Sequence, residues 1–426
     1  MEDNAGNSIR QTPKHIETGN YSSTKYVLVQ MTGIPDYVGP CAFGIEMGVL
    51  LPGCDLQSQV IEALEEVVED GFLTDGDTIC LTESVVARSQ NNYVTKAEIA
   101  QEIREGCTLT PEQTIGVVFP ITSRNRFVPI LAGISRAVPD GKVIVQLQYP
   151  TDEVGNRTLP PEVAAELEAE TDDHITTDDL DRRYPHPITE IDYIQLYRET
   201  IAEEGAEPTI FLSNDPERIL EYQPDAVIVS NVHEREKTRE AVAAYHDNVL
   251  TLQELANDET NDAWSEWGLL GSNMSSGEKI KLAPRRADQF AVELQERIDD
   301  EFDKQVHVII NGDGAYKDPS SGIYELADPC AVFGATPDLE DTLRGGVKYK
   351  FLVDKYHEEE KSREEISEIL AAEAEEHHVE SSIESEGTTP RQLQNIIASL
   401  ADLLTGSADA GTPLVLVKGI TGSSND

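Results

Sequence analysis

The chain has 426 residues, enough for two or three domains, and 39% of them are hydrophobic, which suffices for a large core. It contains 80 Asp and Glu residues but only 33 Lys and Arg residues, so the formal net charge is −47. Such a surface repels nucleic acids and anionic lipids, which argues against a nucleic-acid or membrane role. Adaptation to a halophilic, salt-accumulating host is the simplest interpretation, because 1 M salt screens charges beyond about 3 Å.

The five cysteines form no CxxC pair and no recognisable zinc spacing, so reduced, buried thiols are expected. No stretch of about 18 apolar residues is present, and the polar N-terminus lacks the apolar centre of a signal peptide. These features predict a cytoplasmic protein.

In chain order, residues 1–24 are polar and patternless and predict a disordered tail. A β-rich run at 26–30 is followed by a helix over 56–70, whose apolar residues share one face and which ends before Gly71. A short buried strand follows at 77–82. Strand, helix and strand in this order indicate an α/β layer.

A second α/β region follows at 114–149. Apolar runs at 115–119 and 142–147 predict strands, and 127–138 between them predicts a helix. Residues 151–190 are rich in Asp, Glu and Pro, with weak periodicity, and are interpreted as an acidic excursion.

From residue 191 an α/β pattern resumes, with strands expected at 208–212, 225–230 and 248–250. This part predicts a small Rossmann-like lobe without the glycine fingerprint of a dinucleotide site, and we interpret it as an insertion.

The last part predicts a helix over 288–302 and a strand over 306–310. A charged helical stretch spans 358–378, a further helix 390–404, and a final strand 413–418. No internal repeats are found.

The predicted fold class is therefore α/β, with an α+β mixed-sheet core and an inserted Rossmann-like α/β lobe. The expected division is a tail at 1–24, a first core part at 25–150, an acidic excursion with the inserted lobe at 151–258, and a second core part at 259–426.

Several polar loops lie beside predicted strands, where α/β sheets usually bind ligands. The loops at 32–36, 82–84 and 311–314 follow strands, and 406–412 precedes one. Glycines there allow backbone N–H groups to approach phosphate oxygens. Each loop alone is equally well a plain turn, but together they predict one phosphate site.

An acidic chain can hold a nucleotide only through backbone donors, a few cations and a divalent metal. Asp313, between two glycines at a strand end, is the best carboxylate candidate for that metal, although it could also be a turn residue. Arg124 and Arg126 lie beside another strand end, and their guanidinium groups suit a carboxylate, a phosphate or a plain salt bridge. Asp152 and Glu153 could contact a metal or substrate, or form a solvated turn.

Five segments of the chain resemble, in order, those of the coenzyme F420-0:L-glutamate ligase superfamily. They cover about 26–119 and 260–426, and the most specific is the small-Ala-Asp-x-Gly-x-Pro loop leading into a strand. The segments are Gly33-Ile34-Pro35, 75–88, 268–284 with Gly271-Ser272-Asn273, 308–314 and 406–419. Segments at 123–127, 149–156 and 312–319 are similar to those of a longer subgroup with a central insertion.

The resemblance implies an amide ligase that uses GTP or ATP and Mg²⁺ or Mn²⁺ to add L-glutamate to a carboxylate of a cofactor-like acceptor through an acyl phosphate. It also implies small-molecule partners only and a homodimer. Asp313 and Asn273 are expected at the metal, and Asp313, Arg88, Arg124 and Arg126 are the catalytic candidates. The nucleotide is expected to contact Gly33, Ile34, Pro35, Ser84, Arg88, Gly406, Ser407, Ala408, Asp409 and Gly411.

The chain departs from the family pattern at four positions, one of which is the Asp of the later strand, displaced here to Asp313. Leu270 stands where the family has a metal-binding Asp, Glu83 where it has a hydroxyl residue, and Arg88 where it has a lysine. Two alternatives therefore stay open, a γ-glutamyl ligase for another acceptor such as a folate-like cofactor, and a non-catalytic nucleotide-binding protein.

Overall fold

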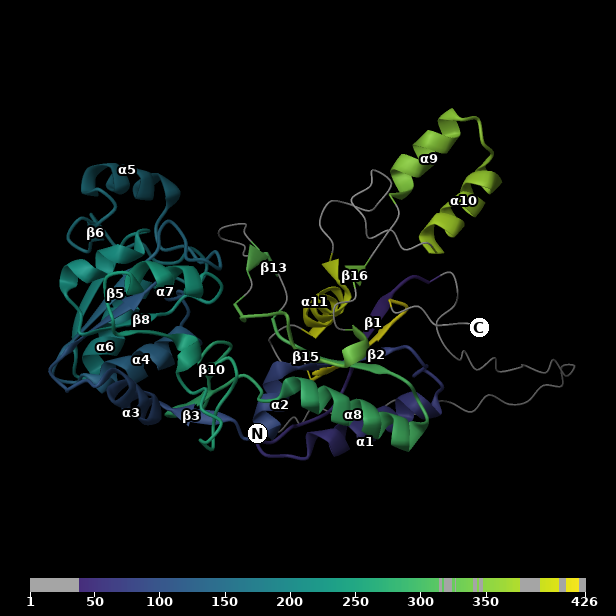
Figure 1. Cartoon of the computed structure of the whole chain (residues 1–426), viewed down its shortest axis with the longest axis horizontal. Helices are drawn as coiled ribbons and strands as arrows, with labels where there is room; N and C mark the ends of the chain where they lie inside the picture. Colours follow the sequence, from purple (N-terminus) through teal and green to yellow (C-terminus); the bar gives the residue numbers. More distant parts are fainter. Residues whose placement is uncertain are drawn as a thin grey trace, which may run out of the picture.

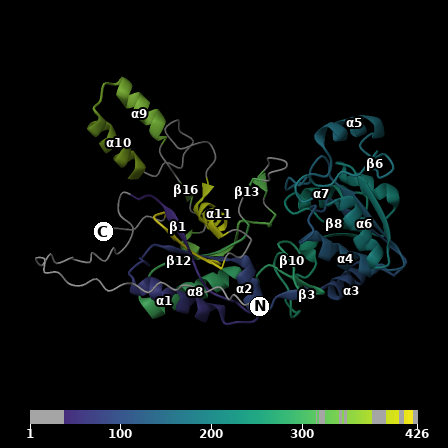
Figure 2. The ribbon, with the colours of Figure 1, turned by 180° about the vertical axis from the view of Figure 1, so that it is seen from behind.

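The computed structural model describes residues 38–313, 316–317, 324–325, 327–339, 343–344, 348–375, 391–405 and 411–420. The predicted tail at 1–24 and strand at 26–30 lie outside these residues. Figure 1 shows two bodies side by side, each built around its own sheet, and Figure 2 shows the same arrangement from behind. We call them the five-stranded and the six-stranded body.

The five-stranded body is a mixed sheet with strand order β1-β18-β2-β12-β15. Only β2 and β12 are parallel neighbours, so their carboxyl ends meet at one edge, while the other pairs are antiparallel. The bounds are β1 Cys41–Ile45, β2 Thr78–Thr82, β12 His307–Asn311, β15 Val332–Ala335 and β18 Leu414–Lys418.

Helices cover both faces of this sheet. One face packs against α1 (Leu56–Glu69) and α8 (Ala287–Phe302), and the other packs against α11 (Leu393–Thr405). In α1 the buried residues recur at helical spacing, Asp55 accepts a hydrogen bond from the amide of Ser58 at 3.1 Å, and the chain leaves the helix at Gly71 with φ +66°. The helices predicted at 56–70, 288–302 and 390–404 are thus confirmed.

The six-stranded body has strand order β6-β7-β5-β4-β8-β9. All neighbours from β7 to β9 are parallel, and β6 is an antiparallel edge strand. Counted from β4, the five parallel strands follow the doubly wound order 3-2-1-4-5, so the predicted Rossmann-like lobe is confirmed. The bounds are β4 Thr114–Val118, β5 Lys142–Leu147, β6 Ile175–Thr176, β7 Glu207–Leu212, β8 Ala226–Val229 and β9 Val249–Thr251.

Strands β4 and β5 belong to this second sheet, so the sheet crosses the boundary that we expected at residue 150. Both strands are nearly continuous apolar runs, as buried parallel strands are. Such a run predicts a strand but does not say which sheet it joins. The inserted lobe therefore begins near residue 96, where the chain leaves β3 (Tyr93–Thr95).

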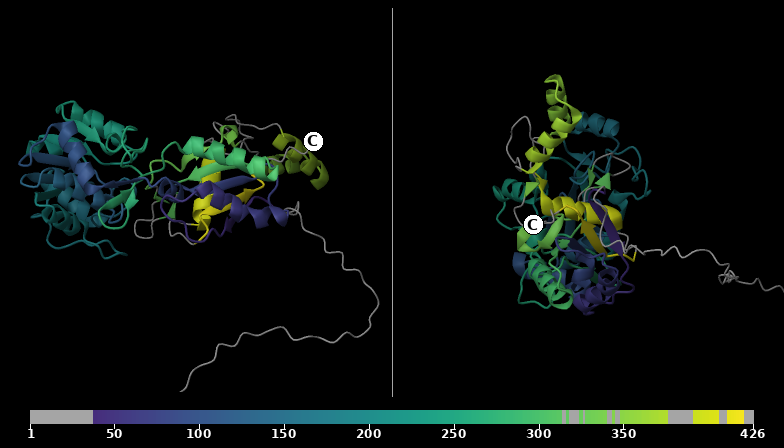
Figure 3. Two further views of the ribbon diagram at one scale, coloured as in Figure 1. Left: turned by 90° about the horizontal axis from the view of Figure 1, so that it is seen from below. Right: turned by 90° about the vertical axis from the view of Figure 1, so that its right-hand side faces the viewer.

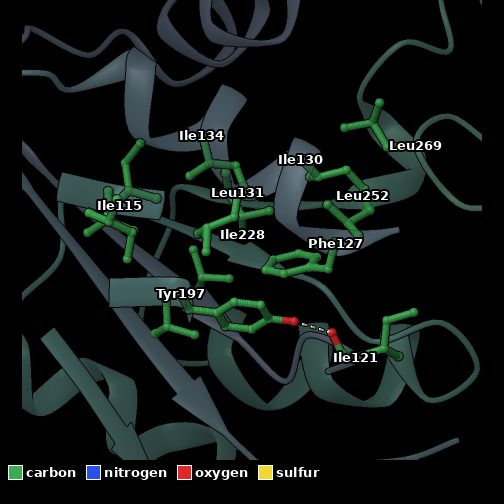
Figure 4. Packing of buried hydrophobic residues seen from close by; sticks show 14 of the residues in the cluster. Ile115, Ile121, Phe127, Ile130, Leu131, Ile134, Tyr197, Ile228, Leu252 and Leu269 are labelled. Atoms are coloured by element: carbon green, nitrogen blue, oxygen red, sulfur yellow. Dashed lines mark hydrogen bonds between the residues drawn. The ribbon is translucent and has the colours of Figure 1, made fainter. Parts of the chain in front are cut away.

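The core of the six-stranded body lies between the sheet and the helices α3, α4 and α6 (Figure 4). Within it the hydroxyl of Tyr197 donates to the carbonyl of Ile121 at 2.7 Å. Helix α7 and the 3₁₀ helix η1 cover the opposite face. The helices are α3 Lys96–Cys107, α4 Phe127–Ala137, α5 Pro161–Thr171, α6 Tyr193–Glu203, α7 Arg235–Ala243, η1 Pro216–Tyr222 and η2 Leu252–Glu254.

A small antiparallel ribbon joins the two bodies, as the view from below in Figure 3 shows. It consists of β10 (Asn273–Met274), β11 (Lys279–Lys281) and β3, with Thr95 opposite Lys279. The chain thus leaves the five-stranded body and returns to it on neighbouring strands.

The charged stretch predicted as a helix over 358–378 contains α10 (Arg363–Glu375), whereas residue 358 is the last of a separate helix, α9 (Tyr349–Glu358). The two helices pack together through Leu352, Ile366 and Leu370 and project from the five-stranded body (Figures 1 and 3). None of the helices in the described ranges combines the length and apolar composition needed to cross a membrane. The remaining elements are α2 Glu83–Ser89, α9 Tyr349–Glu358, α10 Arg363–Glu375, β13 Tyr316–Lys317, β14 Tyr324–Glu325, η3 Pro337–Leu339, β16 Leu343–Arg344 and β17 Arg391–Gln392.

Candidate active site

Three chain segments meet at the edge where β2 and β12 end. Thr82 and Asn311 are register partners at the ends of these parallel strands, and the chain continues into Glu83 and into Gly312-Asp313. The amide of Thr82 donates to the carbonyl of Pro413 at 3.2 Å, which brings the start of β18 to the same edge. The predicted loops at 82–84 and 311–314 therefore converge, and so does the end of the 406–412 loop.

At this edge Arg126, from the start of α4 in the six-stranded body, holds two carboxylates of the five-stranded body. One guanidinium nitrogen, Nη1, donates to Asp328 Oδ1 at 2.6 Å, and Nη2 donates to Asp313 Oδ2. The second oxygen of the fully buried Asp328 accepts from the amide of Asp313 at 2.7 Å. Both carboxylates are thus fixed by hydrogen bonds, and Arg126 joins the two bodies at this point.

A buried ion pair lies beside this group. Lys281 Nζ, from β11, donates to both oxygens of Glu83 at 2.7 and 2.6 Å, and both side chains are almost completely buried. Burial raises the pKa of Glu83, Lys281 opposes the rise, and the negative charge of Asp328 adds to it.

The pKa of Asp313 reflects the charges of the whole cluster. Burial and the charge of Asp328, opposed by Arg126, raise the pKa of Asp313 to about 7. Glu83 and Asp402, the latter from α11, are also close enough to raise this pKa. Four acidic side chains and two basic ones, Arg126 and Lys281, therefore share one region, and its formal charge is negative. A divalent cation would compensate such an excess.

Buried oxygens without a hydrogen-bond partner also line this edge. Thr82 Oγ1 and Asn311 Oδ1, at paired positions of β2 and β12, have no partner among the described residues. Carboxylate, hydroxyl and amide oxygens are the donors that Mg²⁺ and Mn²⁺ prefer, so the residues present fit such an ion. Within the described ranges, however, no three Asp, Glu, His or Cys side chains are grouped as metal ligands. Arg126 and Lys281 pair with the carboxylates here.

The structure brings Asp313 and Arg126 together, and it places Ser84 in the first turn of α2, beside Glu83. Asn273 lies opposite Lys281 in the ribbon, and its side-chain oxygen accepts from the amide of Met274 at 2.8 Å. It is thus near the cluster, without a described contact to Asp313.

The other expected side chains lie away from the cluster. The guanidinium of Arg88 donates to the carbonyl of Leu50 at 2.8 Å, and that of the exposed Arg124 donates to the side chain of Asn125 at 3.3 Å. Leu270, where the family has an Asp, is buried in the apolar core of the six-stranded body. Gly411, in contrast, belongs to the end of the 406–412 loop that reaches this edge; it has φ +85°, and its carbonyl accepts from the amide of Met47 at 3.2 Å. Gly33, Ile34, Pro35, Gly406, Ser407, Ala408 and Asp409 lie outside the described residues.

Sequence reasoning missed Asp328 and Lys281. It placed Glu83 in the loop 82–84 after a buried strand, by the same signal that identified Asp313, but gave its side chain no role. Asp328 and Lys281 carry no such local mark, because their partners are far away in the chain.

Gly312 allows the close approach on which this cluster depends. A Cβ atom at this position would lie 2.6 Å from the ring of Phe333, 2.8 Å from Asp328 Oδ2 and 2.9 Å from the carbonyl oxygen of Cys330. Gly312→Ala is therefore expected to displace Asp328 and to lower the free energy of unfolding by about 1–3 kcal/mol, measured by urea denaturation. Gly39→Ala is the control, because nothing lies within 4 Å of a Cβ there. Equal stability of the two variants would contradict the described packing.

Comparisons with known proteins agree with the resemblance seen in the sequence. The sequence model of the F420-0:Gamma-glutamyl ligase family matches residues 44–419, nearly the whole chain. No curated protein sequence matches it. Among solved structures, the universal stress protein from Archaeoglobus fulgidus in complex with dAMP matches 33% of this chain and 98% of its own length, at 15% identity and a TM-score of 0.20. The family match extends across both bodies and the site between them, and the chain belongs to the F420-0:Gamma-glutamyl ligase family, whose members are amide-forming ligases.

Proposed function

We propose that this ligase adds L-glutamate to a carboxylate of a cofactor-like acceptor, with GTP or ATP and Mg²⁺ or Mn²⁺, through an acyl phosphate at the edge where β2 and β12 end. The observation that carries the proposal is the convergence of Glu83, Asp313 and Asp328 with Arg126 and Lys281 at this edge. The family match supports the reaction class.

The reaction consists of two transfers. An oxygen of the acceptor carboxylate attacks the terminal phosphorus of the nucleotide, and the nucleoside diphosphate leaves. The amine of glutamate then attacks the acyl carbon, and phosphate leaves together with the oxygen that the acceptor contributed. Both steps concentrate negative charge on phosphoryl oxygens, so the main requirement on the protein is electrostatic stabilisation.

The described residues supply this stabilisation in two ways. Asp313 and Asp328 would hold the metal ion, with the unpartnered oxygens of Thr82 and Asn311 as neutral donors. The ion would neutralise phosphate oxygens when bound. Arg126 and Lys281 orient the buried carboxylates and compensate part of their negative charge.

Two acceptors are tested, because Leu270 replaces an Asp of the family pattern and a large lobe adjoins the site. F420-0 is the first acceptor to test, and a folate-like cofactor is the second. A cytoplasmic homodimer is the expected form of the protein.

The test is an isotope-transfer assay. Acceptor labelled with ¹⁸O in its carboxylate is incubated with protein, Mg²⁺ or Mn²⁺, L-glutamate and either GTP or ATP, and the released phosphate is analysed by mass spectrometry. One ¹⁸O per phosphate is expected for an acyl phosphate, and release should require both glutamate and acceptor. Release of unlabelled phosphate at the same rate without acceptor would contradict the proposal.

A further inference from the structure

The six-stranded body contains the position at which doubly wound folds bind ligands, and this position is separate from the ligase cluster. Its strand order reverses between β4 and β8, and in such sheets ligands bind beyond the carboxyl ends of the strands at the reversal. Strand β4 leads there into Phe119, which has φ +54°, and β8 leads into Ser230-Asn231-Val232. None of the carboxylates of the ligase cluster comes from these two strand ends.

A carboxylate from a distant segment fills the anion position at this reversal. The backbone amides of His233 and Glu234, just before α7, donate to Glu153 Oε2 at 3.0 and 3.3 Å, and the amide of Val232 donates to the other oxygen, Oε1. Helix α7 has nine residues, and free amides at a helix N-terminus form a ready site for a carboxylate or phosphate.

Glu153 is brought to this position by its buried neighbour. Asp152 accepts from the amides of Thr122, at 2.7 Å, and Asn156, at 2.8 Å, so the turn that carries Glu153 is firmly attached to the end of β4. The pair Asp152-Glu153 is therefore neither a plain solvated turn nor part of the ligase cluster.

A small, largely apolar cavity adjoins these amides. It is lined by Ile121, Phe127, Ser230, Val232, Leu252 and Ser272, among others, so Val232 borders the cavity and also bonds Glu153. Ser272 is 2% exposed, and its Oγ has no hydrogen-bond partner among the described residues. A buried polar atom without a partner is costly, so this oxygen points to a polar group that binds beside it.

We propose that the reversal between β4 and β8 is a second small-molecule site, for a ligand with a phosphate or carboxylate group. The anionic group replaces the Glu153 carboxylate on the amides of Val232, His233 and Glu234, and the ligand adjoins the small cavity that Ser272 lines. Arg126 lines the same cavity while it holds Asp313 and Asp328, so a bound ligand lies next to the ligase cluster. The proposal does not depend on the reaction proposed above.

The test compares Glu153→Gln with the wild-type protein by isothermal titration calorimetry in phosphate-free buffer with KCl. The probes are inorganic phosphate, AMP, benzoate and, as the uncharged probe, adenosine. Glutamine at position 153 carries no negative charge, so it competes less strongly than glutamate for the three backbone amides. The variant should therefore bind at least one anionic probe about tenfold more tightly than the wild type does, with the affinity for adenosine unchanged. AMP and benzoate distinguish a phosphate-bearing ligand from a carboxylate-bearing one.

Glu236→Gln is the matched control. Glu236 is an exposed residue in the first turn of α7, and its replacement removes one negative charge, as Glu153→Gln does. Binding of a nucleotide at the ligase edge would be the same in all three proteins. If Glu153→Gln does not fold, Glu153→Asp serves instead, since the shorter side chain cannot reach the three amides. Equal affinities of the Glu153 and Glu236 variants for every anionic probe would overturn the proposal.

Discussion

Asp313→Ala is expected to reduce the ligation rate about 10³-fold, which corresponds to about 4 kcal/mol of transition-state stabilisation. Asp313 is the carboxylate that lies at the end of β12, contacts Arg126 and has a pKa raised to about 7 by burial and by Asp328. Its removal takes away the first proposed donor for the metal ion, whereas the other residues of the cluster stay in place. Initial rates at saturating nucleotide, with Mg²⁺ and with Mn²⁺, measure the effect.

The fold should tolerate this change. Arg126 keeps Asp328 as a partner, and one of several mutually repelling carboxylates is removed. The urea midpoint should therefore be unchanged or slightly higher. Asp300→Ala is the control, because Asp300 is an exposed aspartate of α8 in the same body. Wild-type turnover in the Asp313 variant would remove this residue from the site.

Arg126→Ala is expected to lower the free energy of unfolding by about 3–5 kcal/mol. The guanidinium is largely buried and is the shared partner of Asp313 and Asp328, so its loss leaves two carboxylates unpaired in a poorly hydrated region. Activity should fall as well, because both carboxylates would then change position or take up protons. Urea denaturation monitored separately in each body gives the measurement, since two bodies need not unfold in one step.

Arg124→Ala provides a matched comparison for this experiment. It removes the same charge two residues earlier in the same loop, but Arg124 is exposed, and among the described residues its guanidinium hydrogen-bonds only to Asn125. The free energy of unfolding of the Arg124→Ala variant should stay within about 0.5 kcal/mol of the wild-type value. Similar effects of the two substitutions would mean that the buried contacts of Arg126 contribute nothing specific.

These two arginines also show where sequence reasoning stops. In the sequence Arg124 and Arg126 are equivalent candidates, and only the hydrogen bonds of Arg126 to Asp313 and Asp328 distinguish one from the other. The partner Asp328 is 202 residues away, and no local pattern predicts a contact over that separation.

The helices and strands themselves could be predicted more fully from the sequence. Helix α8 and strand β12 follow from helical spacing and from a short apolar run, and Asp313 follows from its position at the strand end. Helix α3 escaped detection, although its capping box of Thr95 and Glu98 is visible in the sequence. The sheet to which β4 and β5 belong could not be predicted, because the apolar sequence of a buried strand does not indicate which strands pair with it.

The ribbon between the bodies has an evolutionary consequence. Thr95 and Lys279 face each other on antiparallel strands, so a turn of about two residues could join them if everything between were deleted. Recombination could thus exchange the lobe in a single event, and the remaining chain would keep its sheet. A shortened descendant would lose Arg126 with the lobe, and would have to evolve another cation for Asp313 and Asp328.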